Sequence, residues 1–222
     1  MLSRTILLAA ASLAVACPAG VALAQSAEPM TFFVSSVGSG KGADFGGLAG
    51  ADALCQKLAT DAGKAGNFTW RAYLSTSSFG GGTIVNARDR IGNGPWHNVK
   101  GELIARNVDE LHGVKNGLTK QTALTEKAAV VNGRGDTPNA HDILTGSRPD
   151  GTASLGNADS TCKNWTSGAD DGSALVGHHD RIGLNQDPPM LSWNSAHPSA
   201  GCSQPKLVQT GGAGQIYCFA AR

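Results

Sequence analysis

A segment near the end of the chain carries side chains that could bind a metal ion or a ligand. Its tryptophan-asparagine pair, in SWNSAHPSAGC at residues 192–202, raises the question of a calcium and sugar site. Nearby imidazole and carboxylate groups are common transition-metal ligands. The candidate ligand-binding residues are His178, Asp180, Trp193, Asn194 and His197. Whether they bind a ligand or fill a core depends on the elements that position them.

His178 and His179 are adjacent in the sequence. Neighbouring side chains of an extended segment point to opposite faces, so at most one of the two joins a given site. We therefore interpret these histidines as loop residues that form hydrogen bonds, with a zinc site as the alternative. The sequence predicts no metal site and no cofactor.

The elements expected around this segment are one early helix and strands at both ends of the chain. Apolar residues recur at helical spacing over 47–62, with Gly63 just beyond, which predicts an amphipathic helix that buries Cys55. Alternation in the final run, GQIYCFAAR, predicts a strand with Cys218 on one face and Tyr217 on the other. Further strands are expected at 30–36, 69–76 and 141–147, and a short capped helix at 107–113. The pattern predicts an α+β domain with a long loop region.

The start of the chain has the features of a secretory signal. Arg4 precedes a short apolar run, and Ala22-Leu23-Ala24 has the form of a cleavage site. We expect a signal peptide at 1–24, a single domain at 25–222, and export to the periplasm or the cell exterior. Lipid anchoring at Cys17 is the alternative. No apolar run approaches the roughly 20 residues of a membrane-spanning helix, so no transmembrane segment is predicted.

The charge of the mature chain excludes one class of partner. Removing the signal peptide removes Arg4, so Lys+Arg falls from 18 to 17 against 17 Asp+Glu, a net charge of zero. A neutral chain has no overall field that attracts a polyanion. We therefore expect no nucleic-acid partner.

Four cysteines remain after cleavage: Cys55, Cys162, Cys202 and Cys218. An even number in an exported chain predicts two disulfides, and three pairings are possible. If the first and last strands pair, Cys55 on the helix lies near Cys218 on the last strand. The nested pairing, Cys55 with Cys218 and Cys162 with Cys202, then follows more naturally than the other two.

Five segments follow one another along the chain as GADFGGLAGADALCQKLA, TWRAYLSTS, NVKGELIARNVDELHG, HDILTGSRPDG and CKNWTSG. Their order resembles that of endostatin's own segments. With the helix-borne cysteine and the terminal I-Y-C-F strand, the chain resembles a C-type-lectin-like domain of the endostatin-like branch. NWTSG, VGHHDRIG, SWNSAHPSAGCS and GGAGQIYCFA are also similar to exported bacterial proteins called lectins by similarity. The resemblance spans most of the mature chain and implies this fold.

The resemblance implies a binding module whose ligand contacts the region from Cys162 to Cys202. Calcium-dependent members hold the ion with a Glu/Gln-Pro-Asn/Asp triplet and an Asn-Asp pair after the tryptophan. Here Ser195 stands where the pair needs Asp. QDPP at 186–189 contains the residue types of the triplet, but in a different order. Too few carboxylates remain for an ion that takes about six to eight oxygens. We therefore expect carbohydrate binding without the familiar calcium site.

Within this region, we expect Trp193 to pack in the core near the inner disulfide. Ligand contacts then fall to His178, Asp180, Asn194 and His197 on the exposed side of the loop. The alternative is a module that binds an extracellular or envelope protein or serves as a structural part of the envelope.

A metal-dependent enzyme is a remote alternative. No G-x-S-x-G or comparable context is present. Formylglycine-generating enzymes share the lectin-like fold but use free reactive cysteines, whereas all four cysteines here are expected in bridges. Endostatin binds zinc through a histidine-bearing amino-terminal segment, which the start of this mature chain lacks. We therefore expect no catalytic activity.

Overall fold

The computed structural model describes residues 1, 28–156 and 158–221. Apart from Met1, the predicted signal peptide at 1–24 lies outside the described residues, and so does Cys17. The described part has a mixed α+β structure in which the main sheet is the largest element. The α+β fold class predicted from the sequence is confirmed at this level.

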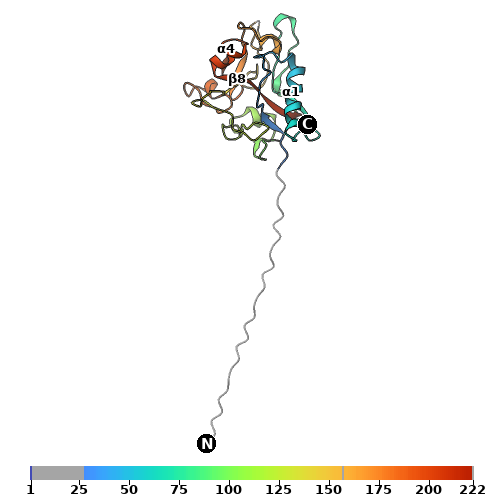
Figure 1. The fold of residues 1–222 in the computed structure, drawn as a ribbon, viewed down its shortest axis with the longest axis vertical. Helices are drawn as coiled ribbons and strands as arrows, with labels where there is room; N and C mark the ends of the chain where they lie inside the picture. The colour runs from blue at the N-terminus through green and yellow to red at the C-terminus, as the bar shows by residue number, and fades with distance from the viewer. Residues whose placement is uncertain (2–27, 157, 222) are drawn as a thin grey trace.

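The last strand, β8 (Gly212–Ala221), lies in the main sheet and crosses the middle of the fold in Figure 1. Its Ile216 and Cys218 side chains belong to one buried cluster, whereas Tyr217 and Phe219 belong to a second, aromatic-rich cluster. Successive side chains of a strand point to opposite faces, so β8 separates the two clusters. The predicted two-faced character of this strand is confirmed.

β8 also organises the rest of the main sheet. β1 and β2 pair antiparallel with it, β5 pairs parallel with it, and the sheet continues from β5 through β6 to β7. A second sheet is formed by β3 and β4. The strands are β1 (Phe32–Val34), β2 (Thr69–Ala72), β3 (Trp96–His97), β4 (Leu103–Ala105), β5 (Asp142–Leu144), β6 (Leu175–His178) and β7 (His197–Pro198). The first and last strands do pair, which was the condition for the nested disulfides.

The two predicted helices are present. α1 (Gly47–Asp61) packs against β2 and carries buried Cys55. α2 (Val108–His112) begins where the Asn107 side chain accepts a hydrogen bond from the backbone N–H of Glu110. The remaining elements are α3 (Cys162–Trp165), α4 (Gln204–Thr210) and the 3₁₀ turns η1 (Phe79–Gly81), η2 (Ala87–Asp89) and η3 (Pro188–Leu191). All four residues of α3 have a positive φ, so it is a left-handed turn.

The disulfides are nested. Cys55 is bonded to Cys218 with a Cα–Cα distance of 5.5 Å, and Cys162 to Cys202 at 5.7 Å. The outer bridge ties α1 to β8, and the inner bridge closes the loop region that contains β6 and β7. The nested pairing is confirmed.

Candidate functional site

Three neighbouring strands bring a carboxylate and two imidazoles to one end of the main sheet. Asp142 begins β5 and lies opposite His178, the last residue of β6. On the other side of β6, His197 at the start of β7 lies opposite Val176. Val176 and His178 are two residues apart, so they share a face of the strand. The pairing of the strands therefore brings Asp142, His178 and His197 together.

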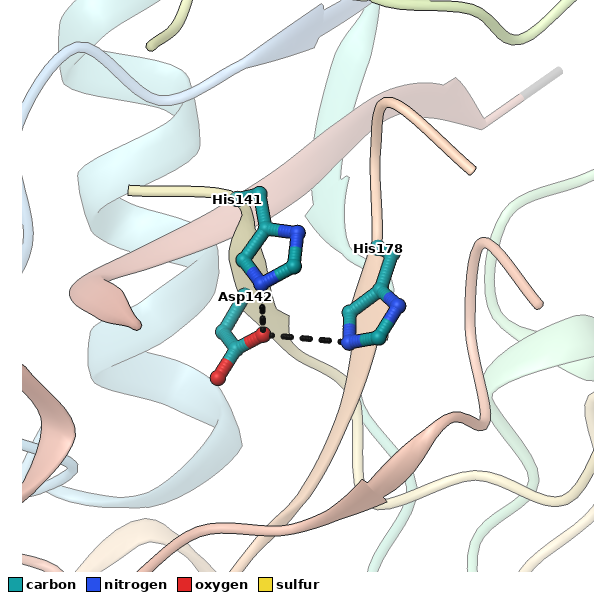
Figure 2. A group of neighbouring side chains, drawn as sticks. All are labelled: His141, Asp142 and His178. Atoms are coloured by element: carbon teal, nitrogen blue, oxygen red, sulfur yellow. Dashed lines mark ion pairs between the residues drawn. The ribbon is translucent and has the colours of Figure 1, made fainter. Parts of the chain in front are cut away.

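His141 completes the group, which we call the histidine cluster: His141, Asp142, His178 and His197. The Asp142 Oδ1 atom lies 3.2 Å from His141 Nε2, 3.3 Å from His178 Nε2 and 3.7 Å from His197 Nε2. The Nε2 atoms of His178 and His197 are 2.9 Å apart. Figure 2 shows two of the imidazoles directed at the Asp142 carboxylate.

The opposite nitrogen of each ring contacts an oxygen atom. His178 Nδ1 lies 2.7 Å from the carbonyl oxygen of Met190, and His197 Nδ1 lies 3.1 Å from that of Pro198. His141 Nδ1 lies 3.3 Å from the Oδ1 atom of Asp180. These contacts hold each ring so that its Nε2 atom faces the Asp142 carboxylate.

The cluster is buried around an unsatisfied carboxylate. Asp142 is 2% exposed, and neither of its carboxylate oxygens accepts a hydrogen bond. His141 and His178 are 3% and 1% exposed, whereas His197 is half-buried. The ligand atoms of His141, Asp142 and His178 all lie within 4.8 Å of one another, close enough to hold a single metal ion.

Asp180 supports the cluster from one side. Its carboxylate accepts hydrogen bonds from the backbone N–H groups of Arg134 and Ile182 as well as contacting His141. Burial alone would raise the pKa of Asp180, but these contacts outweigh it and lower the pKa to about 2. Asp180 is therefore a carboxylate at neutral pH, which makes it an acceptor for an N–H at His141 Nδ1.

The protonation of His178 and His179 is biased in opposite directions. Burial lowers the pKa of His178, but the Asp142 carboxylate and the Met190 carbonyl outweigh that effect and raise it. Burial lowers the pKa of His179, whose Nε2 atom lies 3.1 Å from the Asn132 carbonyl oxygen, away from the cluster. Of the two adjacent histidines, only His178 belongs to the cluster.

A groove of about 660 Å³ lies beside the cluster and shares His197 with it. Its walls are largely apolar, and its polar groups come chiefly from residues 192–197 and from Arg181. Among the lining residues are Val114, Pro149, Pro188, Pro189, Leu191 and His197. A mostly apolar groove of this volume with a few polar groups is typical of a ligand site.

Trp193 packs in the core, as predicted, and is 3% exposed. Its Nε1 atom donates to the Leu111 carbonyl oxygen, and its ring contacts Tyr73 and Tyr217. It belongs to the aromatic-rich cluster, whereas both cysteines of the inner bridge belong to the other. Trp193 therefore packs with the aromatic-rich cluster and not with the cluster that contains the inner disulfide.

Of the remaining candidates, which were expected on the exposed side of the loop, only His197 is partly exposed. His178, Asp180 and Asn194 are buried, at 1%, 6% and 1% exposure. The Asn194 amide donates to the Tyr73 hydroxyl and to the carbonyl oxygens of Arg148 and Pro149, while its Oδ1 atom accepts from Ser192. These internal contacts occupy the side chain that the sequence suggested for ligand binding.

Sequence reasoning did not connect His141 and Asp142 with the other candidates. They stand 37 and 36 residues before His178, and only the pairing of β5 with β6 brings them together. The available signal was the His-Asp pair at the start of the predicted strand HDILTGS.

The chain matches no protein-family model and no curated protein sequence. In the described part of the chain, every helix is too short or too polar to cross a membrane.

Proposed function

We propose that this chain is an exported binding domain of C-type-lectin-like fold whose ligand, a carbohydrate, lies in the groove beside His197. The observation that carries the proposal is the groove itself: about 660 Å³, bordered by the segment 188–198 within the loop that the inner disulfide closes. The disulfides agree with export to an oxidising compartment. The order of the lectin-like segments supports the fold.

The groove matches a sugar ring in two respects. Its apolar wall, with Pro188 and Pro189, offers a surface for the C–H face of a pyranose. Its polar lining residues, among them His197 and Arg181, offer partners for hydroxyl groups. Pockets of this kind use an apolar surface for affinity and a few polar groups for orientation. Neither feature requires calcium.

A glycan array probed with the mature protein tests this function. Val114 is 87% exposed on the groove wall, so Val114→Arg should obstruct the groove and abolish binding without unfolding the chain. Val208→Arg is the matched control, because Val208 is 53% exposed on α4 and does not line the groove. Glycan binding that Val114→Arg leaves unchanged would contradict the proposed location.

An apolar segment of an extracellular or envelope protein is the second candidate ligand. The observation that favours it is the largely apolar lining of the groove. This ligand would be favoured if no glycan bound and if the protein bound apolar peptides in a peptide array. Val114→Arg should then abolish peptide binding, and Val208→Arg should not.

The absence of catalysis stays a prediction.

A further inference from the structure

The histidine cluster brings four acceptor atoms close to one another. A backbone carbonyl can only accept a hydrogen bond, so His178 and His197 must carry hydrogen at Nδ1, where each faces a carbonyl oxygen. The Asp180 carboxylate likewise favours hydrogen at Nδ1 of His141. In these neutral tautomers, all three Nε2 atoms present lone pairs.

Those lone pairs face one another and a negative charge. His178 and His197 bring their Nε2 atoms within 2.9 Å, and Asp142 Oδ1 lies 3.2–3.7 Å from all three imidazoles. Neither carboxylate oxygen of Asp142 has a hydrogen-bond donor. A buried carboxylate without a partner is costly, so this arrangement calls for a positive charge at its centre.

We propose that the histidine cluster is a transition-metal site that binds Zn²⁺ through Nε2 of His141, His178 and His197 and Oδ1 of Asp142. Zn²⁺ prefers four such ligands in a tetrahedron, in which Zn–N bonds of about 2.0–2.1 Å place ligand atoms roughly 3.3 Å apart. Four of the six separations among these atoms run from 2.9 to 3.7 Å, on either side of that spacing, and the ligand atoms of His141, Asp142 and His178 all lie within 4.8 Å of one another. The proposal does not depend on the carbohydrate function.

The surroundings of the cluster have the features of a built metal site. Each imidazole is held through its Nδ1 atom by a carboxylate or a carbonyl oxygen, which is how metal-binding histidines are oriented and made more basic. Calcium is a poor fit, because it takes about six to eight oxygen ligands and three of these four ligands are nitrogen atoms. The four cysteines of the described part are in disulfides, so no thiolate there competes for the ion.

A small space lies beside the imidazoles. A small cavity of about 130 Å³ is lined by His141, His178 and His197 and reaches Arg134, Asn139 and Thr210. A water molecule occupies about 30 Å³ in the liquid, so this space admits an ion with a few waters but no larger ligand. Two of its lining residues, Arg134 and Leu184, are exposed, so the cavity lies between the cluster and the surface.

The test uses untagged mature protein, because a histidine tag would itself bind metal. After dialysis against a chelator and a check that the protein is folded with both disulfides intact, Co²⁺ is titrated in and then displaced with Zn²⁺. We expect one ion per chain and the intense visible absorption of four-coordinate cobalt. His197→Gln removes one ligand at a half-buried position and should weaken binding by at least about 10- to 100-fold, the loss that an outer-shell change already causes.

His97→Gln is the matched control, because His97 is also half-buried and lies on β3, outside the cluster. Asp142→Asn provides a second test by removing the charge, and if it fails to fold, His197→Gln still decides. A folded wild-type protein that takes up no Co²⁺ or Zn²⁺ would overturn the site. So would equal binding by the His197→Gln and His97→Gln variants, because the cluster would then be a network of protonated histidines around Asp142.

Discussion

Asp142 distinguishes two interpretations of the histidine cluster, a metal site and a network of protonated histidines. Its carboxylate is buried and accepts no hydrogen bond, although three imidazole nitrogens lie within 3.7 Å of Oδ1. Without a metal ion, protonated imidazoles must balance its charge, and the Nδ1 contacts leave only the Nε2 positions for the added protons. With a metal ion, the same contacts place neutral imidazoles in their ligating form.

Asn194, the second residue of the tryptophan-asparagine pair, has a structural role in the fold. We expect Asn194→Ala to destabilise the fold by about 1–3 kcal/mol, because it removes the hydrogen bonds that this buried amide donates to the Tyr73 hydroxyl and to the carbonyl oxygens of Arg148 and Pro149. Urea unfolding measures the change. Asn67→Ala is the control, since Asn67 is exposed. A ligand-binding role without a structural one would instead leave the unfolding midpoint of the Asn194 variant unchanged.

At the scale of elements, the sequence predicted the helices and strands whose residue pattern lies within a single stretch of the chain. The spacing of apolar residues predicted a helix at 47–62, against 47–61 observed. The Asn107 cap and Gly113 bounded α2 as expected. The alternation of β8 predicted which side chains share a face. Each of these follows from near neighbours along the chain.

Elements defined by long-range contacts were missed. β6 is four residues long and largely buried, so it shows no alternation of polar and apolar residues. β7 has only two residues and exists through its pairing with β6. Because the cluster depends on the register of β5, β6 and β7, the sequence indicated His178 and His197 singly but not their meeting with His141 and Asp142.

Gly177 in β6 lets the tryptophan-bearing segment lie against the sheet. A Cβ atom there would come within 1.9 Å of the Trp193 carbonyl oxygen. We expect Gly177→Ala to displace 192–194 and cost about 1–3 kcal/mol or more, as overpacking does. Gly40→Ala is the comparison, because its Cβ meets no atom within 4 Å and only its positive φ is strained. Urea unfolding in which Gly177→Ala costs no more than Gly40→Ala would contradict this account.

At the scale of the whole molecule, the two disulfides constrain different parts of the fold. The outer one joins α1 to β8, and the inner one closes the loop region that contains β6, β7 and the groove wall. The 40-residue separation of Cys162 and Cys202 gives that bridge a large entropic effect on the unfolded chain.

Replacing the inner bridge by Cys162→Ala with Cys202→Ala should cost about 2–5 kcal/mol. Hydrogen exchange should rise more over the loop from 162 to 202 than over β8, because β1 and β2 still pair with β8. The double variant Cys55→Ala with Cys218→Ala is the counterpart, with increased exchange expected in α1. Equal loosening of β8 and the loop in the inner-bridge variant would contradict this division.

X-ray absorption at the zinc edge of protein loaded with one equivalent of Zn²⁺ tests the proposed metal site most directly. The account predicts four nitrogen or oxygen ligands at about 2.0–2.1 Å, with the outer-shell scattering of three imidazoles, and the loss of one imidazole in His197→Gln. A six-coordinate, water-dominated shell, or a spectrum that His197→Gln leaves unchanged, would contradict it.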